Sequence, residues 1–150
     1  MITTVDVETS WQKTENGGYD PSPFHPDNIL VSVGINDEYY FTNHSERIDD
    51  GCYHKIQSIL DKSTLLIGHN IKFDLMWLLE AGFKYNGRVY DTMLGEYILN
   101  RGIRKSLTLE MCCRRRKIGS KDNRIKEFTD RGISFENIPA DIVEEYGRID

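Results

Sequence analysis

The order of strand and helix patterns along the chain is the strongest constraint on its fold. Three β-type segments come first, at residues 2–7, 29–35 and 38–42, and helical and β-type patterns alternate after them. Asn36 and Asp37 tolerate turn dihedrals, so the second and third segments predict a hairpin. This order predicts an α/β fold with a mixed central sheet of about five strands, the first three antiparallel, flanked by helices.

The alternating part of the chain begins with an amphipathic helix. Apolar residues recur near helical spacing over residues 48–61, and a short buried strand is expected at 65–67. A heavily apolar helix is expected over 70–81, because Gly82 is a favourable helix terminator. A further short strand at 89–91 leads into another helix.

Two more helices are expected toward the end of the sequence. Ser106 is positioned to cap a helix that runs through Arg114. Asn137 is predicted to cap the last helix, with Pro139 at its first position. Residues 11–28, in contrast, hold three prolines and no periodicity, and this pattern predicts a long loop.

The composition is that of one globular domain covering residues 1–150. Of the 150 residues 39% are hydrophobic, which suits one sizeable core. No apolar run approaches the roughly 20 residues that span a bilayer, and the N-terminus lacks a signal-peptide layout. The three cysteines include no CxxC pair, so a reducing compartment is expected. We therefore expect a cytoplasmic protein.

The distribution of charge is strongly asymmetric. The net charge of −5 argues against a nucleic-acid partner, since phosphate contacts require Lys and Arg. Residues 101–131, however, hold eleven basic against four acidic residues, a local balance of +7, and the rest of the chain carries −12. This asymmetry indicates either a basic wall beside an acidic pocket or a solvated helical face.

Carboxylates occur at regular spacing on two elements that are expected to be rigid. Asp6 and Glu8 are two residues apart in the first strand and therefore point to the same face. Asn70 and Asp74 are four apart, one turn of the expected helix. Each pair also has an ordinary interpretation, as an exposed strand end or as a helix N-terminal carboxylate favoured by the helix dipole.

A third pair, Tyr146 and Asp150, is again four residues apart on the expected last helix. Mg²⁺ and Mn²⁺ prefer oxygen ligands, so convergent Asp and Glu side chains are the pattern that binds them. Two such ions about 3.5–4 Å apart stabilise the attacking and leaving oxygens in phosphodiester hydrolysis. The combination of the three pairs is more specific than any one of them.

Taken in this order, the pairs resemble the Exo I, Exo II and Exo III motifs of the DEDD exonuclease superfamily, in its tyrosine-containing branch. The chain is most similar to the proofreading domain of phage-type family A DNA polymerases. The turn at 90–92 and the helix start at 106–107 are common in these exonuclease domains, and segments 23–26 and 132–150 carry the closer similarity to phage and bacterial family A polymerases. The resemblance implies a ribonuclease-H-like fold.

The resemblance also implies a metal-dependent 3′-to-5′ exonuclease that releases nucleoside monophosphates from the 3′ end of single-stranded DNA. Tyr146 would position the attacking water, and Thr9 and Asn70 would contact the substrate. Two Mg²⁺ or Mn²⁺ ions would be held by four carboxylates: Asp6, Glu8, Asp74 and Asp150. We expect a truncated piece, with a polymerase domain C-terminal to it and, if phage-derived, a location in the host cytoplasm.

Two alternatives remain open from the sequence. A ribonuclease D-like enzyme that trims RNA 3′ ends uses the same carboxylates, and contacts to a 2′-hydroxyl are not readable here. A non-catalytic nucleic-acid-binding scaffold is the alternative from another class, although such a domain would be expected to lose at least one of the four acids. Trp11, Tyr19 and Phe24 are candidates for stacking on bases, and His69 is interpreted as structural.

Overall fold

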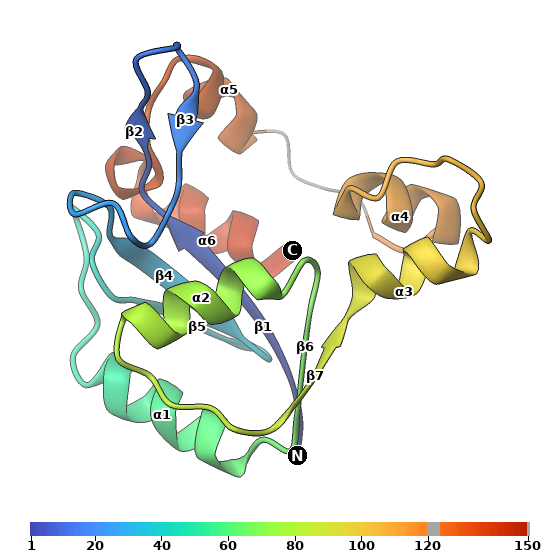
Figure 1. The fold of residues 1–150 in the computed structure, drawn as a ribbon. Helices are drawn as coiled ribbons and strands as arrows, with labels where there is room; N and C mark the ends of the chain where they lie inside the picture. Colours follow the sequence, from blue (N-terminus) through green and yellow to red (C-terminus); the bar gives the residue numbers. More distant parts are fainter. Residues whose placement is uncertain (120–123, 150) are drawn as a thin grey trace.

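A mixed five-stranded sheet forms the centre of the protein (Figure 1). The computed structural model describes residues 1–119 and 124–149. The strand order is β5-β4-β1-β6-β7, and β1 pairs antiparallel with β4 and parallel with β6. The strands are β1 (Ile2–Thr9), β4 (Leu30–Ile35), β5 (Glu38–Phe41), β6 (Leu65–Gly68) and β7 (Arg88–Asp91). The predicted ribonuclease-H-like architecture, with its first three main strands antiparallel, is confirmed.

Helices cover both faces of this sheet. On one face, α1 (Cys52–Lys62) and α2 (Lys72–Glu80) bury Ile56 and Leu78 against inward residues of β1, β4 and β6. On the other face, Phe41 of β5 packs with Ile125 and Val143, which come from α5 (Arg124–Asp130) and α6 (Ala140–Ile149). The period of two along each strand sends alternate side chains into the two cores. The sheet therefore separates two apolar clusters, and β1 lies at its centre.

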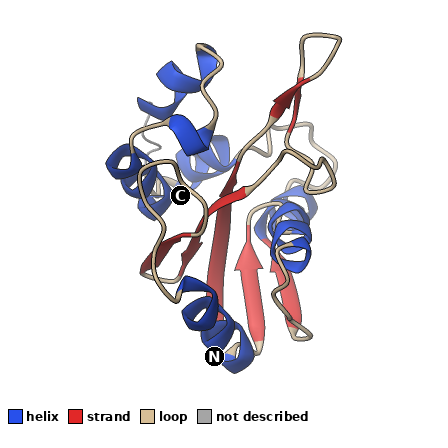
Figure 2. Cartoon of the chain, turned by 90° about the vertical axis from the view of Figure 1, so that its left-hand side faces the viewer, coloured by secondary structure: helices blue, strands red, loops and turns tan. Residues whose placement is uncertain are grey.

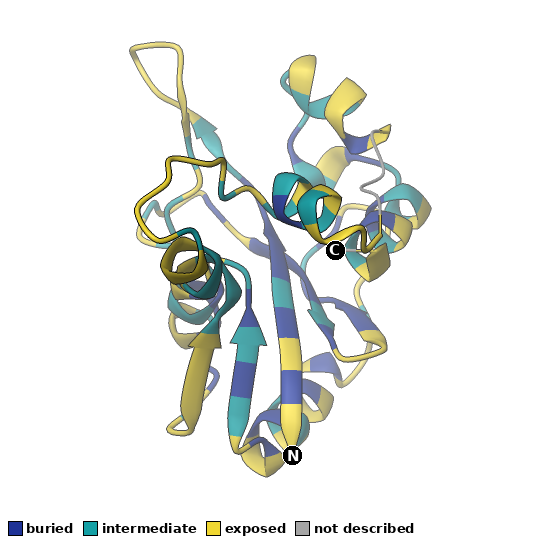
Figure 3. Ribbon diagram, turned by 90° about the vertical axis from the view of Figure 1, so that its right-hand side faces the viewer, coloured by how far each residue is buried: buried dark blue, intermediate teal, exposed yellow. Residues whose placement is uncertain are grey.

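Two further helices lie beyond the edge strand β7 (Figure 1). They are α3 (Thr92–Leu99) and α4 (Leu109–Arg116). Within Thr92–Leu99 no residue is buried, and Cys112 is the buried residue of α4. The exposed side of β7 is visible in Figure 3. These two helices form an arm beside the main body.

Residues 11–28 are not wholly loop, as the sequence had suggested. A small antiparallel ribbon forms between β2 (Gln12–Lys13) and β3 (Tyr19–Asp20) and extends from the main sheet (Figure 2). Trp11 packs against Tyr19, with ring centroids 4.1 Å apart. This aromatic contact across the ribbon gives no periodic pattern in the sequence, so the ribbon was not predicted.

The expected starts of two helices were wrong for the same physical reason. Gly51 has φ 67° and Asn70 has φ 62°, left-handed conformations that a right-handed helix excludes. The first helix therefore begins at Cys52 instead of 48, and the second begins at Lys72 instead of 70.

The expected caps of two later helices were also wrong. Thr108, not Ser106, caps α4, and its side chain accepts a hydrogen bond from the Met111 N–H. Asn137 lies in a short 3₁₀ helix, η1 (Phe135–Asn137), and the Ala140 N–H of α6 donates instead to Glu46 Oε2 at 2.9 Å. The expected end of α6 at residue 150 lies outside the described residues. Within residues 1–119 and 124–149 no helix is long and apolar enough to cross a membrane.

Ile56 tests the core beneath the sheet. Its side chain is fully buried between α1 and the strands, so Ile56→Ala removes contacts that the neighbours refill only in part. We expect a loss of about 2–5 kcal/mol in the free energy of unfolding, measured by urea titration. Ile48→Ala, at a position 63% exposed and outside α1, is the matched control and should change this free energy by less than about 0.5 kcal/mol. Equal losses in the two variants would contradict this description of α1.

Candidate active site

A cleft at the carboxyl end of β1 gathers most of the predicted site residues. Its volume is about 530 Å³, and Asp6, Glu8, Asp74 and Tyr146 are among the residues that line it. They come from β1, α2 and α6, three elements far apart in the sequence. The fourth predicted ligand, Asp150, lies outside the described residues.

The two carboxylates of β1 are held on a strand that is paired on both sides. Asp6 lies opposite Gly34 of β4 and Glu8 opposite Ser32, as expected for side chains that share one face. A register irregularity, of the kind a β-bulge produces, follows between Glu8 and Thr9. Such irregularities redirect the strand and are frequent beside active sites. Glu8 is buried and Asp6 is partly exposed.

Asp74 enters the cleft from the first turn of α2 and is almost fully buried, with 3% exposure. Its Oδ1 accepts a hydrogen bond from the Val7 N–H at 3.1 Å, which ties α2 to β1 between the two strand carboxylates. Burial and the negative charge of Asp6 raise the pKa of Asp74 to about 8, against the opposing effect of the Val7 N–H. The carboxylates therefore repel each other when no cation is present.

Asn70 lies on the same cleft but not on the helix face that the sequence predicted. Its left-handed conformation places it before α2, where its N–H donates to Asp91 Oδ1 at 3.0 Å. Asp91 also caps α3, because the same oxygen accepts from the Met93 and Leu94 N–H groups. Asp91 is an organising residue that sequence reasoning left without a role. Its position at a strand-to-helix boundary was the available signal.

Thr9 and His69 take different positions relative to the cleft. Thr9 is buried and is not among the residues that line it. His69 lines the cleft, and its ring nitrogens bond Thr92 Oγ1 at 3.0 Å and the Leu107 carbonyl oxygen at 2.7 Å. These bonds link the end of β6 to α3 and to the segment before α4, in agreement with a structural histidine.

Tyr146 reaches the cleft because α6 packs closely on the sheet. A Cβ at Gly34 would lie 3.4 Å from the Gly147 carbonyl oxygen, and a Cβ at Gly147 would overlap the ring of Tyr39. That ring is buried, and its hydroxyl is 2.7 Å from Ser32 Oγ. Burial and the nearby charge of Glu8 raise the pKa of Tyr39, so its hydroxyl stays protonated. Glycine at 147 is what allows this close approach.

The comparison with known families decides the assignment of the chain. A model of the 3′-5′ exonuclease domain of family A DNA polymerases matches residues 13–114, about two thirds of the chain. The chain belongs to this exonuclease family. A search of curated proteins gave no match. The matched range of the exonuclease family includes Asn70 and Asp74, while Asp6, Glu8 and Tyr146 lie outside it and are placed at the cleft by the fold.

Members of an exonuclease family of this type use divalent metal ions, which require oxygen donors that converge on one point. Within the described residues, which leave out Asp150, no group of three or more His, Cys, Asp or Glu side chains could hold a metal ion. The chemistry of the lining acids nevertheless fits a hard cation, since Asp6, Glu8 and Asp74 offer oxygen donors alone. A divalent cation would also relieve the repulsion from Asp6, which adds to the effect of burial in raising the pKa of Asp74.

The basic segment, residues 101–131, reaches this cleft, but some of its arginines form ion pairs within the protein. Leu107, Thr108 and Leu109 line the cleft and lead directly into α4. Arg115 and Arg116 pair with Glu96 of α3 at 3.4 and 2.7 Å, and these bonds hold α4 on α3. They lower the pKa of Glu96. Residues 107–109 thus bring this segment to the cleft, and Arg115 and Arg116 join its helix to α3.

Asp74→Asn tests the electrostatic cost of the site in the absence of metal. Because the pKa of Asp74 rises to about 8 in the folded state, the folded chain keeps a proton that the unfolded chain has lost. The stability that the Asp74 carboxyl contributes is fully present below about pH 4, its usual pKa. It is lost as the pH rises from there through about 8, at up to about 1.4 kcal/mol per pH unit. An asparagine still accepts from the Val7 N–H, so we expect this variant to be more stable than the wild type at pH 8.

The measurement is urea unfolding in chelator at pH 5, 6.5 and 8. The difference between Asp74→Asn and the wild type should grow with pH. Asp50→Asn, at an exposed position, should follow the wild type throughout. A difference that does not change with pH would refute the buried, repelled carboxylate.

Proposed function

We propose that this exonuclease domain removes nucleoside monophosphates from the 3′ end of single-stranded DNA by a two-metal-ion reaction. The observation that carries the proposal is the meeting of Asp6, Glu8, Asp74 and Tyr146 at one cleft in a chain of this family. Asp150 would complete the ligand set from the end of α6. A proofreading role beside a polymerase domain is the biological setting that the family assignment favours.

Each residue would contribute to the reaction through a definite property. Asp6 and Glu8 would hold metal from a strand whose backbone is paired on both sides, and Asp74 would do so from a buried helix turn. Divalent ions bound there would supply charge stabilisation for the attacking and leaving oxygens. Tyr146, with 8% exposure, would orient water through its hydroxyl at the wall of the cleft.

The substrate strand would approach along the arm formed by α3 and α4. Arg104, Lys105 and Lys117 are exposed on or beside this arm, which meets the cleft at residues 107–109. Contacts of this kind attract phosphates without reading sequence, so binding should weaken with salt and show little base preference. Phe24 is 68% exposed and remains a candidate for base stacking, while Trp11 and Tyr19 pack on each other.

The direct test is a product ladder from 5′-labelled single-stranded DNA with Mg²⁺, with Mn²⁺ and with chelator. We expect shortening from the 3′ end that needs metal and that Asp6→Ala reduces about a thousandfold, because the loss of a metal ligand removes charge stabilisation of the transition state. Asp50→Ala is the control at an exposed acid and should cut like the wild type. Full activity of Asp6→Ala would exclude Asp6 from the reaction.

The same assay separates the alternatives. A matched RNA strand that is trimmed clearly faster than DNA would favour a ribonuclease D-like enzyme. No ladder from either strand, with retained binding of labelled single-stranded DNA, would favour a non-catalytic scaffold.

Metal binding has a readout that does not depend on catalysis. A ligand that binds the native state alone stabilises it, by about 2.7 kcal/mol at one hundred times its dissociation constant. We expect the thermal midpoint of the wild type to rise with Mn²⁺ or Mg²⁺ and that of Asp74→Asn to rise much less. Equal metal-dependent shifts in the two proteins would place the cation elsewhere.

A further inference from the structure

We propose that a chain of ion pairs between α6 and the β4–β5 hairpin, formed by Asp49, Arg47, Glu144 and Arg148, positions this helix for the exonuclease reaction. We call these four residues the α6 clamp, and Arg148 is its main positioning residue. The inference rests on the proposed function, because the catalytic contribution of α6 is Tyr146. None of the four lines the cleft that holds Asp6, Glu8, Asp74 and Tyr146, while Arg148 also lines a neighbouring pocket that shares Asp6 and His69 with this cleft.

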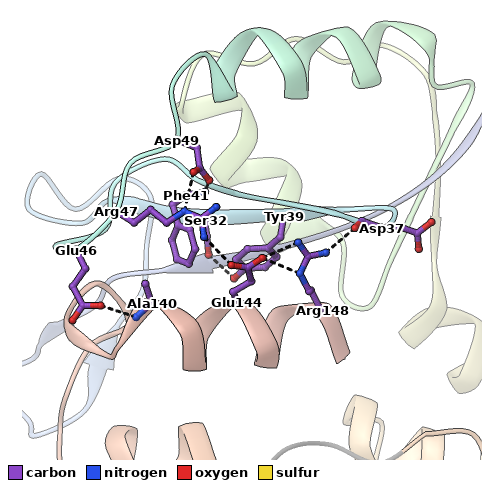
Figure 4. Close-up of polar contacts among 10 residues, drawn as sticks. All are labelled: Ser32, Asp37, Tyr39, Phe41, Glu46, Arg47, Asp49, Ala140, Glu144 and Arg148. Atoms are coloured by element: carbon purple, nitrogen blue, oxygen red, sulfur yellow. Dashed lines mark hydrogen bonds and ion pairs between the residues drawn. The ribbon is translucent and has the colours of Figure 1, made fainter.

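The clamp is a continuous series of short contacts (Figure 4). Arg47 Nε is 2.8 Å from Asp49 Oδ1, and Arg47 Nη1 is 2.8 Å from Glu144 Oε2. The other carboxylate oxygen of Glu144 accepts from Arg148 Nη2 at 2.7 Å and from Arg148 Nε at 3.0 Å. Arg148 Nη1 then donates to the Asp37 carbonyl oxygen at 2.8 Å. One glutamate thus joins two arginines that reach different parts of the sheet.

Both ends of the clamp are anchored to β5 and its turn. Asp49 Oδ2 accepts from the Phe41 N–H at 2.9 Å, and the Arg47 guanidinium lies 5.0 Å from the Phe41 ring centroid. Burial raises the pKa of Asp49, but the Phe41 N–H and Arg47 outweigh it and leave the pKa below its usual value. At the other end, Asp37 belongs to the turn between β4 and β5. The clamp therefore fixes α6 to the β4–β5 hairpin, and β4 of this hairpin pairs with β1, the strand that carries Asp6 and Glu8.

The position of the clamp around the helix gives it control over Tyr146. Glu144 and Arg148 are one turn apart on one side of α6, and Tyr146 is two residues from each, about 200° around the helix. Gly147 lies on the same side of α6 as Glu144 and Arg148, and there the helix packs tightly on the Tyr39 ring. Ion pairs and close packing along this side leave α6 little freedom to rotate or slide, and either motion would displace Tyr146 from the cleft.

The clamp should matter more for catalysis than for stability. The side chains of Arg47 and Arg148 are 43% and 46% exposed, and ion pairs at such positions contribute little to folding. Catalysis is more sensitive, because a displacement of about 1 Å at a reacting group can cost about a hundredfold in rate. An ion pair with a purely structural role would instead lower stability when it is removed and leave the rate of the reaction nearly unchanged.

The experiment compares two single variants, Arg148→Ala and Glu145→Ala, with the wild type. Glu145 is the matched control, because it lies on the same helix and pairs with Arg124 of α5 at 2.7 Å, outside the clamp. At saturating DNA and Mn²⁺ we expect Arg148→Ala to lower kcat about ten- to a hundredfold, with KM for DNA changed less than threefold and the thermal midpoint nearly unchanged. Glu145→Ala should retain the wild-type kcat.

Two further measurements keep the test decisive. Arg148→Lys retains the charge without the guanidinium fork and should restore part of kcat. Hydrogen exchange of the α6 amides should accelerate in Arg148→Ala and not in Glu145→Ala. If Arg148→Ala fails to fold, Arg47→Ala breaks the clamp one contact further from the helix and should lower kcat in the same way.

The outcomes separate the clamp from the proposed function. Wild-type exonuclease activity that disappears in Asp6→Ala supports the function by itself. With that activity present, an unchanged kcat in Arg148→Ala, a change in KM alone, or an equal loss in Glu145→Ala would overturn the clamp. A wild type without activity would overturn the proposed function and, with it, the catalytic role of the clamp.

Discussion

The structure depends on bringing Asp74 close to Asp6 inside the fold. A buried carboxylate is costly unless it is hydrogen-bonded or neutralised, and here a neighbouring negative charge adds to that cost. The Val7 N–H offsets a part of it, and the remainder must be supplied by packing. Ile71, Trp77 and Leu78 provide this packing, because they bury α2 in the core on the α1 side of the sheet. An apolar core thus holds in place a charge arrangement that is unfavourable by itself.

The two cores have separate tasks in this arrangement. The core beneath α1 and α2 fixes the helix that carries Asp74, and the core beneath α5 and α6 fixes the helix that carries Tyr146. Strand β1 is common to both, since its side chains alternate between the faces while its backbone is paired with β4 and β6. The cleft lies where elements from the two sides approach the end of β1. A change in either core is therefore transmitted to one half of the site.

The sheet could be predicted from the sequence because its signals are local, whereas much of the site could not. Period-two patterns and the turn at Asn36 were sufficient for a mixed sheet whose first three main strands are antiparallel, and the spacing of Asp6 and Glu8 was sufficient for their shared face. The left-handed conformation of Asn70 is stabilised by Asp91, 21 residues away, and the first N–H of α6 is bonded to Glu46, 94 residues away. Propensity and periodicity describe neighbours along the chain, so contacts of this kind leave no trace in them.

The same reasoning applies to charge, where a count of residues misleads in both directions. The net charge of −5 argues against a nucleic-acid partner, yet the acids include those that line the cleft, where a bound divalent cation would reverse the local sign. The basic segment overstates the attraction, because Arg115 and Arg116 are engaged with a glutamate whose side chain is only 13% exposed. These two arginines serve to hold the arm in shape beside the cleft. The attraction for phosphate would then come from neighbouring cations that the arm presents to solvent, and it would be directed by the arm's geometry more than by its total charge.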